Sequence, residues 1–176
     1  MESFTCITKH FETRGGIQIE ADFWGEPNEN TVVLLHGGGQ TRHSWGSTAS
    51  VVASKGWCAI SIDLRGHGRS GWASHGEYGL NDFAEDIDCV IQKIGVSPVL
   101  VGASLGGLTG MYLEGHLRPN SIRSLILVDI VPRMNLKGAE RVKSFMSEHL
   151  HTGFSSLEEA AEAISAYNPQ REIPSD

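Results

Sequence analysis

Apolar and polar residues follow one another along this chain in blocks that predict strands and helices in turn. Near the N-terminus, residues 3–11 and 17–24 predict the strands of an antiparallel hairpin, with Arg14, Gly15 and Gly16 at the turn. Short, mostly apolar runs follow, and such runs are typical of strands buried on both faces of a sheet. They cover residues 31–35, 58–64, 98–103 and 122–130.

Helices are predicted between these strands, over residues 43–55, 81–94 and 105–116. In the second of them, Asn81 is the expected N-cap, and apolar residues recur at steps of three and four. Asp86 and Asp88 are expected mostly on the opposite, polar side of that helix. Strands that alternate with helices predict an α/β protein, with a mostly parallel sheet and helices on both of its faces.

The pattern changes after residue 132. Residues 137–149 and 156–167 predict two helices, and Ser156 and Glu159 have the spacing of a capping box. No strand is predicted beyond them. We therefore divide the chain into an α/β core, residues 1–132, and a helical segment, residues 133–176.

Composition and charge narrow the class of protein. The 176 residues suit one domain, and the net charge of −7 disfavours a nucleic-acid-binding protein. No apolar run is long enough to cross a membrane, and the N-terminus lacks the apolar core of a secretion signal. Cys6, Cys58 and Cys89 have no metal-type spacing. We therefore expect reduced thiols, a cytoplasmic protein, and neither a metal nor another cofactor.

The segment Gly102-Ala103-Ser104-Leu105-Gly106 matches G-x-S-x-G and stands between a predicted strand and a predicted helix. A sharp turn there needs small neighbours, because it forces a strained backbone at Ser104, for which we expect a positive φ. The alternative is that Ser104 only caps the helix. A phosphate-binding loop is disfavoured because Leu108 stands where a lysine is required. The dinucleotide-binding G-x-G-x-x-G pattern is not supplied either.

A second glycine-rich loop, His36-Gly37-Gly38-Gly39, follows another predicted buried strand. Bare backbone amides in such a loop can face a developing oxyanion, so the amides of Gly38 and Leu105 are predicted to form an oxyanion hole. A flexible turn is the alternative. We interpret His36 as a packed structural residue rather than a catalytic base, because it lies at a strand end before the loop.

Three motifs together resemble the α/β-hydrolase superfamily: HGGGQTRHSW, DLRGHGRS and GASLGG, in this order and each after a predicted strand. The resemblance implies an α/β-hydrolase fold, with Ser104 as nucleophile and Gly38 and Leu105 as oxyanion donors. Residues 63–68 would then form a loop at the rim, in which Asp63, Arg65 and His67 are interpreted as structural. The helices after residue 132 resemble the start of the cap that covers the pocket in many members.

Having Ser104 rather than an aspartate at the nucleophile position separates the chain from relatives that open epoxides or displace halide. The resemblance then implies hydrolysis of an ester, thioester, lactone or C–C acyl bond, or a cofactor-free perhydrolase. The cap and the apolar strand ends suggest a small, apolar acyl substrate.

The chain departs from the family's pattern at its C-terminal end. The triad runs serine, acid, histidine along the chain, and the histidine follows the last strand. No strand is predicted after residue 130, and none of the histidines has that setting; those considered are His43, His67, His116, His149 and His151. Asp129 is the candidate acid, with a strand-end cap as its alternative role. We therefore expect a truncated hydrolase that lacks the last strands and is weak or inactive.

Other functions stay open. A non-catalytic binding or interaction module would keep the sheet and the cap without a triad, and a phosphate-binding α/β protein is a weaker alternative. The run over residues 122–130 would become the exposed edge of the sheet if no strand lies beside it. We therefore expect aggregation or self-association through this strand, unless the helices after residue 132 cover it.

Overall fold

A computed structural model describes residues 6–133, 136–148 and 152–167. The chain divides into two compact units, Met1–Pro132 and Arg133–Asp176, and each is described here by itself. In the first unit, the strands are β1 (Ile7–Glu12), β2 (Gln18–Trp24), β3 (Thr31–Leu35), β4 (Cys58–Ile62), β5 (Val99–Ala103) and β6 (Ser124–Val128).

These strands form one sheet in the order β1-β2-β4-β3-β5-β6. The hairpin β1–β2 is antiparallel and β2 joins β4 antiparallel, whereas the remaining neighbours are parallel. The predicted fold class is therefore confirmed: a mostly parallel sheet with an antiparallel N-terminal hairpin. The carboxyl ends of β3, β4 and β5 lie at one edge of the sheet, which is where α/β proteins place their sites.

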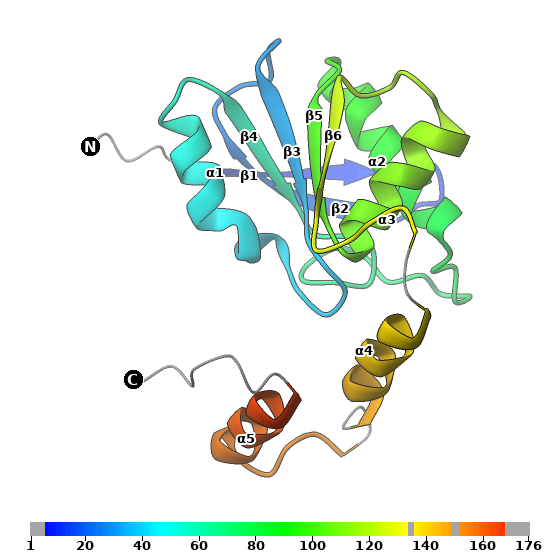
Figure 1. Ribbon diagram of the computed structural model, residues 1–176. Coiled ribbons are helices and arrows are strands. Elements are labelled where there is room, and N and C mark those ends of the chain that lie inside the picture. The colour runs from blue at the N-terminus through cyan, green and yellow to red at the C-terminus, as the bar shows by residue number, and fades with distance from the viewer. Residues whose placement is uncertain (1–5, 134–135, 149–151, 168–176) are drawn as a thin grey trace. The chain divides into compact units, whose positions relative to one another are not determined.

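Helices cover both faces of the sheet (Figure 1). One face carries α1 (Gly46–Ala53), which follows the 3₁₀ turn Arg42–Trp45. The other face carries α2 (Leu80–Ile94) and α3 (Leu105–Tyr112), and α3 continues into the π-helical turn Leu113–Leu117. The larger hydrophobic core lies under α2 and α3 and the smaller one under α1.

The structure corrects two details of α2. Its N-cap is Gly79 rather than Asn81, and the carboxylate of Asp82 accepts the Gly79 amide at 2.8 Å, which starts the helix two residues earlier. Asp86 and Asp88 are buried rather than on a solvated face. The reason is pairing, because Asp86 binds Arg65 and Asp88 binds Arg118.

Strand β6 is shorter than predicted and lies at the edge of the sheet. It pairs with β5, and among the described residues no strand pairs with its other side. Its side chains alternate between half-buried and exposed, and Ile126 is 49% exposed and Val128 39%. The strand therefore has the apolar sequence of a buried strand in the position of an edge strand.

The second unit contains α4 (Leu136–Glu148) and α5 (Leu157–Tyr167). Phe145 and Tyr167 stack with their ring centroids 4.2 Å apart, and Arg141 lies over the Tyr167 ring. Half of the predicted capping box is present, since Ser156 Oγ accepts the Glu159 amide at 3.2 Å. The Glu159 carboxylate accepts instead from Ser155. No helix in the described ranges combines the length and apolarity needed to span a bilayer.

Candidate active site

Ser104 lies at the turn between β5 and α3 and is exposed to solvent. Its backbone has φ 44° and ψ −108°, a conformation that costs free energy for a residue with a Cβ. The expectation of a strained backbone with positive φ at the start of a helix is therefore confirmed. The position at the N-terminus of α3 also favours negative charge on the serine oxygen.

Glycines on either side of Ser104 make this turn sterically possible. A Cβ on Gly102 would lie 2.4 Å from the backbone of Gly106, and a Cβ on Gly106 would lie 2.5 Å from the carbonyl oxygen of Leu35. Both distances are far inside van der Waals contact. Helix α3 therefore packs directly against the ends of β5 and β3, and its first turn is fixed by close backbone contact.

Two hydrogen bonds complete the turn. The Ser104 amide donates to the Val128 carbonyl of β6 at 3.1 Å, and the Gly106 amide donates to the His36 carbonyl at 3.1 Å. The turn is thus held by the strand ends on both sides of β5.

The loop that follows β3 lies beside this turn, since a Cβ on Gly37 would lie 3.5 Å from the Ser104 Cβ. The Gly37 amide donates to Gln40 Oε1 at 3.0 Å, and the Gly39 amide donates to His67 Nε2 at 3.2 Å. Among the residues that the structure describes, the amides of Gly38 and Leu105 donate to no protein acceptor. They are free to receive a ligand, and their role as oxyanion donors stays a prediction.

His36 is completely buried, and both of its ring nitrogens have partners. Nδ1 lies 2.7 Å from the Gly37 carbonyl and must donate to it, so Nε2 is the acceptor of the Leu64 amide at 3.0 Å. Burial lowers the pKa of His36, which keeps the ring neutral. The interpretation of His36 as a structural residue is therefore confirmed.

Under this loop lies a buried ionic cluster around Arg42. Asp63, completely buried, accepts the Arg42 amide at 2.6 Å and its guanidinium at 2.5 Å. The same guanidinium pairs with Glu20 and with Asp22, each at 2.8 Å. Although burial opposes the charged form, the hydrogen bonds that the guanidinium donates to Asp63 and Asp22 raise the pKa of Arg42. Asp63 is thus structural, as expected.

The sequence analysis missed Arg42, Glu20 and Asp22. The signal was present on β2, where two carboxylates occupy alternate positions of an otherwise apolar strand. Alternate positions share one face of a strand, so the two carboxylates need a common cation, which the 3₁₀ turn supplies.

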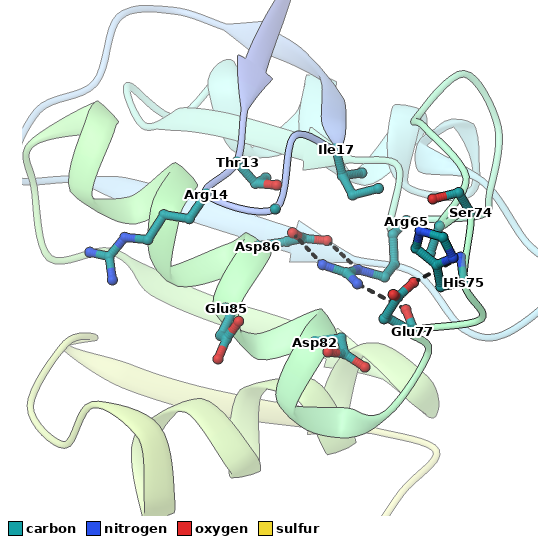
Figure 2. A pocket seen from close by; sticks show the side chains of 12 residues that line it. Thr13, Arg14, Ile17, Arg65, Ser74, His75, Glu77, Asp82, Glu85 and Asp86 are labelled. Atoms are coloured by element: carbon teal, nitrogen blue, oxygen red, sulfur yellow. Dashed lines mark hydrogen bonds and ion pairs between the residues drawn. The ribbon is translucent and has the colours of Figure 1, made fainter.

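Arg65 is also structural and lies against α2 (Figure 2). Its guanidinium binds both carboxylate oxygens of Asp86, at 2.6 and 2.7 Å, and donates to the Glu77 carbonyl at 2.8 Å. Burial raises the pKa of Asp86, and the hydrogen bond from Arg65 only partly offsets that rise. A cavity of about 210 Å³ adjoins this pair, between the β1–β2 turn and the loop before α2. Its lining includes no residue of the loops that carry Ser104 and Gly38.

The described residues do not assemble a triad. The Ser104 hydroxyl makes no hydrogen bond within the described part of the chain. Asp129, the candidate acid, follows β6 directly, is exposed, and has a positive φ of 53°. Among the histidines, His43 lies 3.9 Å from Asp22, and His116 packs on Tyr112. His149 and His151 lie outside the described residues.

Cys6, Cys58 and Cys89 are free thiols, and burial raises the pKa of Cys58 to about 11, which keeps that thiol protonated at neutral pH. Within the ranges described, no group of three or more histidine, cysteine or acidic side chains could hold a metal ion.

A family model described as alpha/beta hydrolase fold matches residues 30–168, most of the chain. The chain belongs to the α/β-hydrolase family. An esterase of Mycobacterium tuberculosis is 36% identical over 123 residues, which are 69% of this chain and 40% of the esterase. The 3-hydroxybutyrate-oligomer hydrolase of Cupriavidus necator is 31% identical over 139 residues, 77% of this chain and 46% of that enzyme.

Solved structures agree on the fold of this α/β-hydrolase. An α/β hydrolase from Novosphingobium aromaticivorans superposes with a TM-score of 0.81 at 22% identity, covering 96% of this chain and 60% of that one. A structure of the M. tuberculosis esterase gives 0.67 at 30% identity, covering 96% and 57%. The chain spans less than half the length of the curated relatives described above.

Proposed function

We propose that this chain carries the nucleophile of a serine hydrolase that cleaves an ester, thioester, lactone or C–C acyl bond in a small, apolar substrate. The observation that carries the proposal is the exposed Ser104 at positive φ, at the start of α3 and beside two unengaged amides. The similarity to esterases and to an oligomer hydrolase of hydroxybutyrate supports ester chemistry over the other bond types.

In the proposed reaction, Ser104 Oγ attacks the acyl carbon while its proton passes to a base. The carbonyl electrons move onto the oxygen, and the amides of Gly38 and Leu105 donate to the oxyanion. Collapse of the tetrahedral intermediate breaks the bond to the leaving group, which takes up the proton, and water then hydrolyses the acyl-enzyme. No cofactor enters any of these steps.

Asp129 is our proposed acid. The Val128 carbonyl, one residue before it, accepts the Ser104 amide, so the end of β6 and the nucleophile turn are joined directly. Asp129 has a positive φ although it is not a glycine, so the backbone changes direction at this residue. Strained backbone conformations of this kind are found at functional sites. The histidine of the triad has no counterpart beside Ser104 in the described part of the chain.

We also propose that the unit after Pro132 begins the cap over the pocket. Its first helix, α4, begins at Leu136, seven residues after Asp129. A cap at this point would supply the apolar walls that a small acyl substrate needs.

A fluorophosphonate probe tests the nucleophile, because the probe forms a covalent bond only to an activated serine. We expect labelling at Ser104, faster than for the heat-denatured chain by up to about 10³-fold, since the amides and the helix dipole remain without a base. Peptide mapping locates the label, and Ser104→Ala should abolish it. Labelling no faster than in the denatured chain would contradict the proposal.

Ester hydrolysis tests the base. Loss of the triad typically leaves about 10³–10⁴-fold acceleration over water, from oxyanion binding alone. We therefore expect weak hydrolysis of p-nitrophenyl acetate, and Ser104→Ala should change it little. A robust rate that Ser104→Ala abolishes would show that a base acts on Ser104 in this chain.

A non-catalytic binding module is the second candidate. The observation that favours it is the free Ser104 hydroxyl, which has no imidazole partner among the described residues. Binding of a product-like carboxylate or alcohol without any labelling of Ser104 would support this alternative.

A further inference from the structure

The loop after β3, which lies beside Ser104, and the loop after β4 each contribute a histidine that binds the other loop. His36 comes from the loop after β3, and its Nε2 accepts the amide of Leu64 in the loop after β4. His67 comes from the loop after β4, and its Nε2 accepts the amide of Gly39 in the loop after β3. The two rings lie 5.0 Å apart, so the reciprocal contacts form one cluster.

The partners of each ring fix its protonation. His67 Nδ1 lies 2.9 Å from the Arg65 carbonyl, which can only accept, so Nδ1 carries the proton. Nε2 must then be bare in order to accept the Gly39 amide. A second proton would turn Nε2 into a donor that faces another donor, and the contact with Gly39 would be lost.

The glycines of the loop after β3 depend on this contact because, among the described residues, their other hydrogen bonds are local. Gln40 accepts the Gly37 amide and donates its own amide to the Gly37 carbonyl, both within the same turn. Gly39 is exposed and has a φ of 75°, and three consecutive glycines lose much conformational entropy on ordering. The bond to His67 therefore fixes the loop's free end to a different part of the chain.

We propose that His67 is a positioning residue: its neutral ring holds Gly39, keeps the loop that carries Gly38 beside Ser104, and releases that loop on protonation. The positioning role rests on the proposed function, since it matters to catalysis only if Gly38 is an oxyanion donor. The hydrogen-bond exchange between the loops does not depend on that role.

The two rings of the pair differ in their access to solvent. His36 is completely buried, whereas His67 is half-buried and reachable by solvent. The groups around His67 include the neutral His36 ring from the other loop and, from its own loop, Asp63 and Arg69. Asp63 is already paired with Arg42, so it offers His67 no free carboxylate.

Two variants of His67 distinguish the role of the Nε2 acceptor from that of the rest of the ring. His67→Gln reaches as far as Nε2 and supplies a carbonyl oxygen that can accept the Gly39 amide. His67→Asn reaches only to Nδ1, so it keeps the bond to Arg65 and loses Gly39. His75→Gln, in an exposed segment before α2, is the matched control. NMR measures the hydrogen-exchange rate of the Gly39 amide, and the fluorophosphonate probe measures the labelling rate of Ser104.

We expect the Gly39 amide of the parent chain to exchange faster, after correction for intrinsic rates, as pH falls from about 8 to 5. At about pH 8, His67→Asn should exchange roughly fivefold faster than the parent, and this difference should shrink as pH falls and the parent loses the same contact. His67→Gln should stay protected and lose the pH dependence, and His75→Gln should match the parent. The Leu64 amide, held by the buried His36, is the internal control for global unfolding.

Ser104 labelling should slow in His67→Asn and recover in His67→Gln. Unchanged Gly39 exchange in His67→Asn would overturn the proposal. Equal labelling in all variants, with Gly39 exchange altered, would overturn the positioning role. If Ser104 is unlabelled in every variant while Gly39 responds as expected, the contact between the loops is supported and the proposed role of Ser104 as nucleophile is contradicted.

Discussion

Two loops meet beside Ser104 and are held in place by different kinds of interaction. The turn from Gly102 to Gly106 is fixed by close backbone contact and by backbone hydrogen bonds to Val128 and His36. The loop from Gly37 to Gly39 is held by polar side chains, and behind it lies the buried Arg42 cluster. A steric turn tolerates changes of pH and fails when volume is added. A loop held by polar side chains fails when the charge or the protonation of those side chains changes.

The largest effect is expected at the cluster behind the polar loop. Arg42→Met leaves Glu20, Asp22 and Asp63 buried without their cation. We expect the free energy of unfolding to fall by about 3–5 kcal/mol, the usual cost of removing one partner of a buried ion pair. Urea unfolding measures it, and Arg69→Met, at an exposed arginine of the neighbouring loop, should stay within about 0.5 kcal/mol of the parent chain. Equal losses would show that the cluster contributes no special stability.

The steric turn should respond to a single added methyl group. In Gly106→Ala, the new Cβ would meet the Leu35 carbonyl oxygen at 2.5 Å and the Leu35 Cβ at 2.6 Å, so the backbone must shift to make room. We expect a loss of about 1–3 kcal/mol or more in urea unfolding. Gly115→Ala is the control, because nothing lies within 4 Å of that position. It should be neutral or stabilising by up to about 1 kcal/mol. A neutral Gly106→Ala would mean that close packing does not hold the turn.

Acid should act on the polar loop. Burial lowers the pKa of His36 below its ordinary 6.5. As pH falls through 6.5, the unfolded chain therefore binds a proton at His36 before the folded chain does. The stabilisation is therefore complete above about pH 6.5 and declines as pH falls, by at most about 1.4 kcal/mol per pH unit for one proton. Urea midpoints at several pH values measure this slope.

In His36→Gln this part of the slope should disappear, whereas His116→Gln, at an exposed position, should keep it. A pH slope that survives unchanged in His36→Gln would assign it to other groups.

The smallest change in folding stability is expected at β6, which supports the steric turn through Val128 but is itself an edge strand. Its unpaired edge and the exposed Ile126 should drive self-association as concentration rises. Ile126→Lys should reduce this association in light scattering while changing the free energy of unfolding by only about 0.5 kcal/mol. Ile7→Lys, on the opposite edge strand β1, is the matched control. A monodisperse monomer at all concentrations would contradict self-association through β6 and would mean that the edge of this strand is covered.

The elements of the sheet were predictable from the sequence because each buried strand is a continuous apolar run. The helix α2 was predictable from its apolar face, but its start was not, because Asp82 reaches back to Gly79 rather than following an Asn81 cap. Asp86 and Asp88 were placed wrongly for a related reason. Their partners, Arg65 and Arg118, are 21 and 30 residues away along the chain, and no local pattern records such pairing.

The sequence by itself determined the turn at Ser104. Its strain depends on the absence of Cβ atoms at Gly102 and Gly106, which is written in five consecutive residues, and the preceding strand and following helix are equally local. The tertiary structure alone decided the environment of the neighbouring loop. Gly39 meets His67 across 28 residues, and Arg42 meets Glu20, Asp22 and Asp63 on two different strands or their ends. The glycines that permit the turn are close together in the chain, whereas the Leu35 carbonyl that meets Gly106 and the partners of the hydrogen bonds and charges are brought there by the sheet.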